Sequence, residues 1–223
     1  MQISPHLRKR PGIDRQRALM WPPLKIAQHG ARGEACEQTL NSFESALREG
    51  AEGIALEVQV PRLSEIFAWV RNQRCLAFVG IDGSTPDVEV KLAEEIGIAK
   101  VHDLVRVISG DSAALRRMRR LDARFHLGLQ FDGRPPALRE AEALGAEVLL
   151  PHWRAISPSF IRRAHGASML VIPWTVDSPR EMRSAILKGV DGIITNYPAK
   201  LTQTVARIQT ASAGRRERAA LAH

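Results

Sequence analysis

From residue 24 onward, short continuous apolar runs alternate with longer amphipathic segments. Runs such as VLL at 148–150 and MLVI at 169–172 lack polar alternation, which is typical of parallel strands buried on both faces. The pattern predicts strands at 24–27, 53–60, 76–81, 105–109, 125–129, 147–150, 168–174 and 192–195. It predicts helices at 41–49, 63–72, 87–96, 112–121, 136–144, 158–165, 179–187 and 199–208. Eight strands alternating with eight helices favour an α/β fold, a single-domain (β/α)8 TIM barrel.

Signals at the helix ends support this reading. Thr39 or Asn41 can cap the first helix, and Ser157 and Ser178 each stand before a proline that suits the first helical position. Glycines that can end helices are Gly50, Gly145, Gly166 and Gly189. A doubly wound open sheet is the alternative, but no Gly-x-Gly-x-x-Gly pattern follows the first strand.

Composition and charge divide the chain into a core and two basic ends. The 223 residues are 44% hydrophobic, carry a net charge of +8 and contain no apolar run long enough to cross a bilayer. We expect a flexible basic arm over residues 1–22, the barrel over 23–209 and a basic tail over 210–223. The polar N-terminus is no secretory signal, and Cys36 and Cys75 show neither metal nor disulfide spacing, so we expect a cytoplasmic protein.

The basic residues suggest partners without specifying one. Clusters lie at 8–17 and 215–218, and another lies on the predicted helix at 112–121. They are consistent with attraction to an anionic membrane surface or polyanion, or with plain solvated surface. No nucleic-acid motif is present, since no aromatic residues are interleaved for base stacking.

Polar residues follow the predicted strands, where a barrel of this kind places its binding site. They are Gln28, His29, Glu57, Asp82, Asp132, His152, Trp174 and Asn196. Each has a structural alternative: a loop histidine can bond to backbone, an aspartate can cap a helix, and the tryptophan can plug the barrel end. Together they predict a polar pocket with an aromatic wall.

Several segments resemble the glycerophosphodiester phosphodiesterase family. Residues 26–40, IAQHGARGEACEQTL, are similar to its opening signature Ile-Ala-His-Arg-Gly-Ala followed by Pro-Glu-Asn-Thr, and Glu37 matches the glutamate there. Residues 61–66, PRLSEI, resemble its Pro-Thr-Leu-Glu-Glu-Val helix start. Residues 174–177, WTVD, and 189–198, GVDGIITNYP, resemble its closing Trp-Thr-Val-Asn and Gly-Val-Asp-Gly-Ile-Ile-Thr-Asp-x-Pro. The resemblance covers roughly residues 24–205.

The resemblance implies a TIM barrel and a phosphoric diester hydrolase of lipid metabolism. Members hydrolyse glycerophosphodiesters to glycerol 3-phosphate and an alcohol. A divalent cation, Mg²⁺ or Ca²⁺, held by carboxylates stabilises charge on the phosphoryl oxygens. Two histidines act as acid and base, since imidazole exchanges protons near neutral pH.

This chain departs from the family at the residues that carry its chemistry. The first histidine of the family falls on Gln28, whose amide cannot transfer a proton, and the phosphate-binding arginine falls on His29. The Glu-x-Asp metal pair falls on Ala55 and Glu57.

The third strand departs in the same way. The family's Glu-Ile-Lys falls on residues 80–82, GID, which removes a carboxylate and puts Asp82 in place of a lysine. The insertion after the second strand, which carries the second histidine, is missing.

Three functions remain open at this stage. The first is a catalytically impaired or inactive barrel kept for binding or assembly, with a small phosphate-containing ligand or a protein as partner. The second is an active phosphodiesterase with a relocated site, with His29, Glu57 and His152 as catalytic candidates; Glu57 and Asp82 would be its doubtful metal ligands, together with Asp132. The third is an adaptor for anionic membranes or polyanions. A divalent cation is expected only for the second.

Overall fold

A computed structural model of the chain describes residues 22–31, 38–58, 62–83, 87–133 and 138–220. Most of the predicted basic arm, residues 1–21, and the candidate Glu37 lie outside these ranges. Side chains are described as far as residue 213, so the cluster at 215–218 lies outside them as well.

The described elements alternate strand and helix along the chain, as predicted. The strands are β1 (Leu24–Gln28), β2 (Gly53–Glu57), β3 (Leu76–Gly80), β4 (Val105–Ser109), β5 (His126–Phe131), β6 (Ala146–Pro151), β7 (Leu170–Val171) and β8 (Gly192–Thr195). The helices are α2 (Leu40–Arg48), α3 (Leu63–Gln73), α4 (Val88–Ala99), α5 (Ser112–Leu121), α6 (Leu138–Ala143), α7 (Pro158–Gly166), α8 (Pro179–Lys188) and α9 (Pro198–Ala220), with a short 3-10 helix, η2 (Trp153–Ala155).

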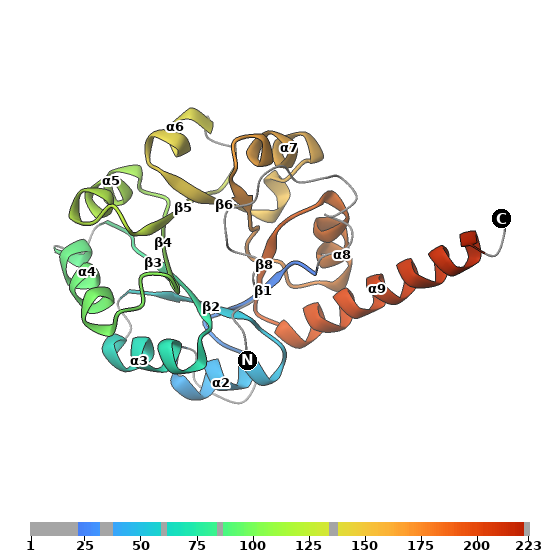
Figure 1. Ribbon diagram of the computed structural model, residues 1–223, viewed down its shortest axis with the longest axis horizontal. Helices are drawn as coiled ribbons and strands as arrows, with labels where there is room; N and C mark the ends of the chain where they lie inside the picture. The colour runs from blue at the N-terminus through green and yellow to red at the C-terminus, as the bar shows by residue number, and fades with distance from the viewer. Residues whose placement is uncertain (1–21, 32–37, 59–61, 84–86, 134–137, 221–223) are drawn as a thin grey trace.

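The strands form one parallel sheet that curls into a barrel with the helices outside it (Figure 1). The order of pairing is β7-β6-β5-β4-β3-β2-β1-β8. Isolated backbone hydrogen bonds close the remaining gap: Asp191 N donates to Val171 O at 2.9 Å, and Ile194 N donates to Pro173 O at 3.0 Å. The fold is therefore a nearly closed TIM barrel, which confirms the predicted class.

Most of the buried apolar side chains that the structure describes lie in two clusters. The larger one packs the outer faces of the strands against the helices, with Phe43, Phe67 and Phe160 among its members. The smaller one lies inside the barrel and contains Ile26, Ala55, Leu76, Phe78, Ile108, Val148, Leu150, Ile172 and Ile194. Because successive strand residues point to opposite faces, β2, β3, β4, β6 and β8 each contribute to both clusters. β3 is an apolar run that is buried throughout, as expected for a parallel strand covered on both faces, and β4 is buried throughout although it contains Arg106 and Ser109.

Several helix ends are those expected from sequence. Thr39 caps α2 and forms a reciprocal capping box with Ser42. Ser157 and Ser178 cap α7 and α8 ahead of the prolines at the first helical position. Gly189 ends α8 with a φ of 93°, a conformation that glycine adopts without a steric penalty.

Three boundaries differ from the prediction for physical reasons. β2 ends at Glu57 and only five residues separate it from α3, consistent with a missing insertion. β7 is short because Pro173 has no N–H for the sheet, and pairing resumes only as a single bridge between His152 and Trp174. α9 runs past residue 208 to Ala220 because the added residues are rich in alanine and arginine, which favour helix.

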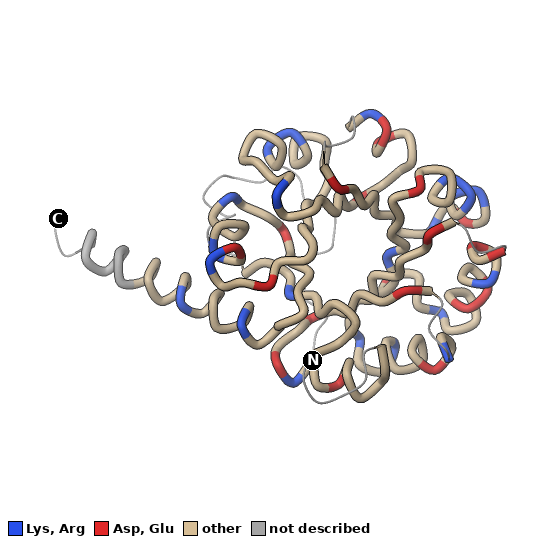
Figure 2. Tube along the Cα trace, turned by 180° about the vertical axis from the view of Figure 1, so that it is seen from behind, with Lys and Arg blue, Asp and Glu red and all other residues tan. Residues whose placement is uncertain are grey.

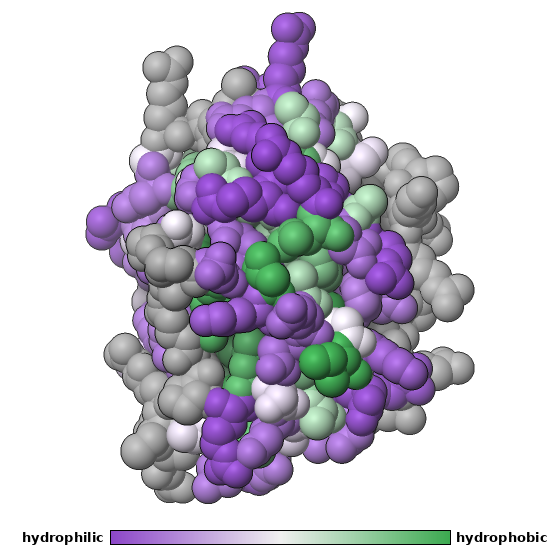
Figure 3. All heavy atoms as spheres, turned by 90° about the vertical axis from the view of Figure 1, so that its left-hand side faces the viewer, coloured by the Kyte–Doolittle hydropathy of each residue, from purple (hydrophilic) through white to green (hydrophobic). Residues whose placement is uncertain are grey.

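The outer surface carries no membrane-crossing element in the described part of the chain, where no helix is both long and apolar enough. Isolated apolar side chains are nevertheless exposed on α4, where Ile98 is 75% and Val90 43% exposed. Figure 3, which faces this side of the barrel, shows green apolar atoms set among purple polar ones.

Candidate functional site

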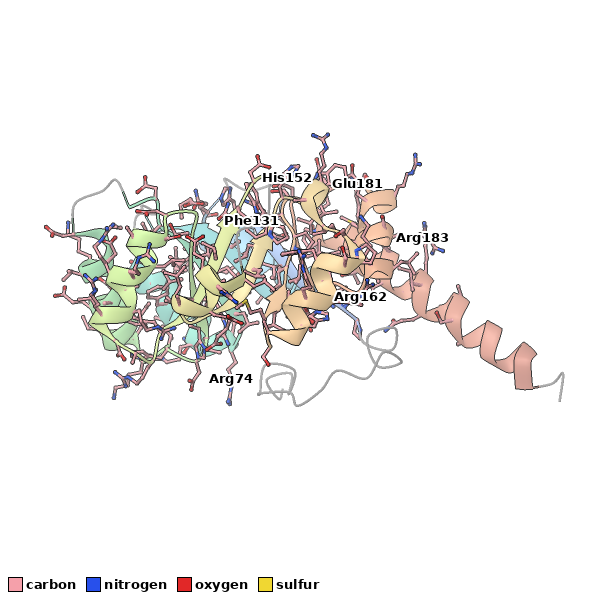
Figure 4. The ribbon with its side chains drawn as sticks, turned by 90° about the horizontal axis from the view of Figure 1, so that it is seen from above. Arg74, Phe131, His152, Arg162, Glu181 and Arg183 are labelled. Atoms are coloured by element: carbon pink, nitrogen blue, oxygen red, sulfur yellow. The ribbon has the colours of Figure 1, made fainter. Side chains whose placement is uncertain are left out.

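The inward-facing residues of the strands end in a ring of polar side chains at the C-terminal edge of the barrel. With a period of two, each polar residue lies two positions beyond a member of the inner cluster and on the same face. The pairs are Ile26 and Gln28, Ala55 and Glu57, Leu150 and His152, Ile172 and Trp174, and Ile194 and Asn196. The result is a polar mouth above an apolar floor, the position of the active site in such barrels. Figure 4 shows His152 near one edge of the barrel and Arg74 at the opposite edge.

A tight turn after β1 brings His29 to Glu57. His29 has a φ of 55° and Gly30 a φ of 95°, both left-handed, and the turn is held by His29 N donating to Ala55 O at 2.8 Å. His29 Nε2 lies 4.0 Å from Glu57 Oε1, and the Glu57 side chain is half-exposed. Gln38 supports the pair, since its Oε1 accepts from Glu57 N at 3.0 Å. An ion pair can form there when the imidazole is protonated.

The Glu57 carboxylate lies over Gly80 of β3. A Cβ atom at Gly80 would lie 2.5 Å from Glu57 Oε2 and 2.9 Å from Oε1, closer than side-chain atoms approach one another. Gly80 is the position of the family's third-strand glutamate, according to the resemblance described above. Glu57 therefore occupies space that a side chain on the third strand would need. The glutamate, which is longer than the aspartate of the family motif at this position, and the glycine fit one another.

A second group forms where β5, β6 and β7 end. His152 Nδ1 lies 3.8 Å from Asp132 Oδ1, although 75% of the Asp132 side chain is exposed. The same Nδ1 accepts from Arg154 N at 3.4 Å and caps the short helix η2. The His152 ring packs edge-on against Trp174 at 5.9 Å, and Trp174 Nε1 donates to Leu150 O at 2.8 Å. These two contacts hold the Trp174 ring in place beside His152.

Four further hydrogen bonds fasten the loop after β7 to its neighbours. Thr175 Oγ1 donates to Gln28 Oε1 at 3.1 Å. Asp177 accepts from Thr195 Oγ1, from Asn196 N and from Asn196 Nδ2, the last at 2.7 Å. The family motifs quoted above have asparagine and aspartate at these two positions, so the two residue types are exchanged in this chain, where Asn196 donates to Asp177. Comparing the two motifs as a pair would have revealed this contact.

The structure does not gather the candidate carboxylates into a metal site. Asp82 follows β3 and is exposed, and Asp132 projects beside His152. In the described part of the chain, no group of three or more His, Cys, Asp or Glu side chains could hold a metal ion. Ala55 and Gly80 supply no ligand where the resemblance calls for carboxylates. Among the residues that the structure describes, the donor set therefore does not fit the family's divalent cation.

Shifted pKa values occur at the opposite, N-terminal end of the strands. Arg106 is buried there, and loss of hydration lowers the pKa of its guanidinium, partly offset by Glu147 and Asp103. The hydrogen bond with His126 holds the pKa of Glu147 below its usual range, and the two side chains are 2.8 Å apart. Burial raises the pKa of the Cys75 thiol to about 12. This end of a TIM barrel generally serves stability.

Comparison with known proteins supports the fold and its ancestry. The model of the glycerophosphoryl diester phosphodiesterase family matches residues 55–200. The chain is 24% identical to a glycerophosphodiester phosphodiesterase of Caldanaerobacter subterraneus, covering 82% of this chain and 97% of that one. Among solved structures it is similar to a phosphodiesterase of Oleispira antarctica in complex with the product sn-glycerol-3-phosphate (TM-score 0.74, 16% identity, 85% and 99% covered). It is also similar to a glycerophosphodiester phosphodiesterase of Parabacteroides distasonis (TM-score 0.75, 16% identity, 83% and 98% covered).

Proposed function

Since this chain belongs to the glycerophosphoryl diester phosphodiesterase family, we propose that it is a binding member of that family that does not carry out metal-dependent hydrolysis. The observation that carries the proposal is the pairing of Glu57 with Gly80. The carboxylate fills the space of a third-strand ligand, and no trio of ligands forms elsewhere among the described residues. A single half-exposed carboxylate binds Mg²⁺ or Ca²⁺ poorly because both ions prefer several oxygen ligands.

The mouth retains groups suited to holding a small polar molecule. Trp174 offers an aromatic face, while Gln28, Thr175 and Asn196 offer amides and a hydroxyl. His29 and His152 offer ring nitrogens that can donate to a phosphate oxygen. A small phosphate-containing ligand suits this set, and the lack of a metal trio among the residues with described side chains favours binding over turnover.

Hydrolysis assays test the proposal directly. The purified chain is incubated with glycerophosphocholine and with bis(p-nitrophenyl) phosphate, with Mg²⁺ or Ca²⁺ and with EDTA, beside the Caldanaerobacter relative as a positive control. We expect no rate above the protein-free reaction. Turnover that requires the cation and stops with EDTA would refute the proposal. Calorimetric titration with each cation should show no saturable binding at millimolar metal.

A hydrolase with a relocated site is the second candidate. It is favoured by the two histidine–carboxylate pairs, His29 with Glu57 at 4.0 Å and His152 with Asp132 at 3.8 Å, which could serve as acid and base. In that case Glu57→Gln and His152→Ala would each lower kcat by a factor of about 10²–10⁴. Arg183→Ala, on the outer face of α8, is the matched control and should leave the rate unchanged.

A further inference from the structure

A pocket outside the mouth lies between η2 and one side of α8. Its volume is about 330 Å³, at the lower end of the range of small-molecule sites. Its lining residues are Trp153, Ile156, Ser178, Arg180, Glu181, Ser184, Ala185 and Lys188. Those from α8 recur every three or four positions, so they form one stripe of the helix that faces η2.

Trp153 forms a fixed aromatic wall of the pocket. Its backbone N–H donates to Trp174 O at 3.0 Å, and its indole packs against the large apolar cluster. The Arg154 guanidinium lies 5.0 Å from the ring centroid, within range of a cation–π contact. Ile156 and Ala185 are buried and add apolar surface. The pocket therefore offers aromatic and apolar surface against which an aromatic ring could pack, with a guanidinium beside it.

The charged groups of the pocket are predominantly cationic. Lys188 Nζ donates to Ile156 O at 3.3 Å, which holds the ammonium at the pocket and leaves two of its three donors available. Arg180 is exposed and forms no ion pair with any residue that the structure describes. Glu181 is the single acidic residue among those that line the pocket.

The surrounding face has the same sign of charge. Residues 153–213 contain three acidic side chains, of which Asp177 is bonded to Asn196 and Asp191 to His165. The basic residues of this segment are Arg154, Arg162, Arg163, Arg180, Arg183, Lys188, Lys200 and Arg207. On α5, by contrast, Arg117 is neutralised by Glu89 at 2.7 Å. Figure 2 shows lysines and arginines on the side of the barrel from which α9 projects.

We propose that the pocket between η2 and α8 binds a small aromatic anion, such as an aromatic phosphate or carboxylate. The ring would stack on Trp153, and Arg180 and Lys188 would bind the anionic group through charge-assisted hydrogen bonds. The pocket is distinct from the barrel mouth, because none of the mouth residues Gln28, Glu57, His152, Trp174 and Asn196 is among its lining residues. The two adjoin, since the His152 ring lies 5.8 Å from the Trp153 ring and 5.9 Å from the Trp174 ring. Figure 4 shows Glu181, at the pocket, near the same edge of the barrel as His152.

Calorimetric titration with three probes tests the chemistry: 1-naphthyl phosphate, 1-naphthol and inorganic phosphate. The proposal expects saturable binding of 1-naphthyl phosphate at one site, and binding at least about tenfold weaker for the other two, because each lacks half of the recognised group. No saturable binding of 1-naphthyl phosphate below about 1 mM would overturn the proposal, as would equal binding of inorganic phosphate.

Paired variants locate the site. Arg180→Glu should weaken the binding of 1-naphthyl phosphate at least about tenfold. Arg183 is likewise exposed on α8 but does not line the pocket, so Arg183→Glu should change the affinity less than about threefold. Trp153→Ala should abolish binding of 1-naphthyl phosphate. Trp153→Phe keeps an aromatic wall and should retain binding, which distinguishes loss of the ring from misfolding. Equal effects of the two arginine variants would refute the site. Glu57→Gln removes an acidic charge from the mouth, so tighter binding in that variant would place the ligand there instead.

Discussion

The turn that carries His29 depends on Gly30, and its replacement by alanine should be unusually destabilising. Gly30 has a φ of 95°, where an L side chain costs about 1 kcal/mol relative to glycine. The added Cβ would lie 2.6 Å from Ser42 Cβ and 2.9 Å from the Ser42 backbone carbon. Ser42 is fully buried in the first turn of α2, and its hydroxyl donates to His29 O at 3.3 Å. Relief of the clash must therefore move helical backbone.

Gly189→Ala is the matched control. Gly189 has a φ of 93°, and nothing lies within 4 Å of an added Cβ, so this variant carries the backbone strain alone. We expect Gly189→Ala to lower the free energy of unfolding by about 1 kcal/mol. Gly30→Ala should lower it by about 2–4 kcal/mol, because overpacking adds about 1–3 kcal/mol.

Urea unfolding followed by far-UV circular dichroism measures both values on the full chain. If the two variants agree within about 0.5 kcal/mol, the Ser42 contact does not brace the turn and the reasoning fails. A large loss for Gly30→Ala alone would establish that the β1–α2 connection is held by packing and not by conformational preference only.

Other predictions concern the remaining contacts. Asp177→Asn and Asn196→Asp should each weaken the loop after β7, and the double variant, which restores the family's order, should recover stability with a coupling energy of about 0.5–3 kcal/mol in a urea double-mutant cycle; additive losses would disprove the pairing. The hydrogen bond with His126 lowers the pKa of Glu147, so its stabilising effect is full above about pH 4.3 and is lost as the pH falls through the lower folded pKa. Glu147→Gln should therefore reduce the fall in the free energy of unfolding at acid pH. An unchanged pH dependence would count against the pairing of Glu147 with His126. The Cys75 thiol, with its pKa raised to about 12, should resist iodoacetamide at pH 8 until urea unfolds the chain; rapid native labelling would contradict its burial.

Much of the scaffold could be predicted because it depends on local rules. α7 and α8 each begin with a serine followed by a proline, and α8 ends at a glycine. These residues act on backbone groups within a few positions of the chain, so they can be recognised in the sequence without knowledge of the fold. The unbroken apolar run of β3 likewise favours burial on both faces. The long α9 was underestimated because helix propensity continues past the last residue that packs on the barrel.

The mouth was predictable as a place and not as a set of contacts. A period of two puts Gln28, Glu57, His152 and Trp174 on the inner face once the strands are known. Which of these side chains contact one another depends on the stagger of neighbouring strands and on the volumes of the individual side chains. From the sequence, Glu57 is a catalytic candidate and a doubtful metal ligand of a relocated site; that its carboxylate lies over Gly80 is visible only in the structure.

The sequence by itself determined the alternation of strand and helix, the caps, and the absence of carboxylates at Ala55 and Gly80, since residue identity and local propensity suffice for each. Only the tertiary structure decided that Glu57 fits against Gly80, that Asp177 binds Asn196, and that Trp153 and α8 enclose a separate pocket. These contacts join residues that are neighbours only after the barrel closes. Their geometry is set by strand stagger and by the packing of helices around the sheet, which no local pattern encodes.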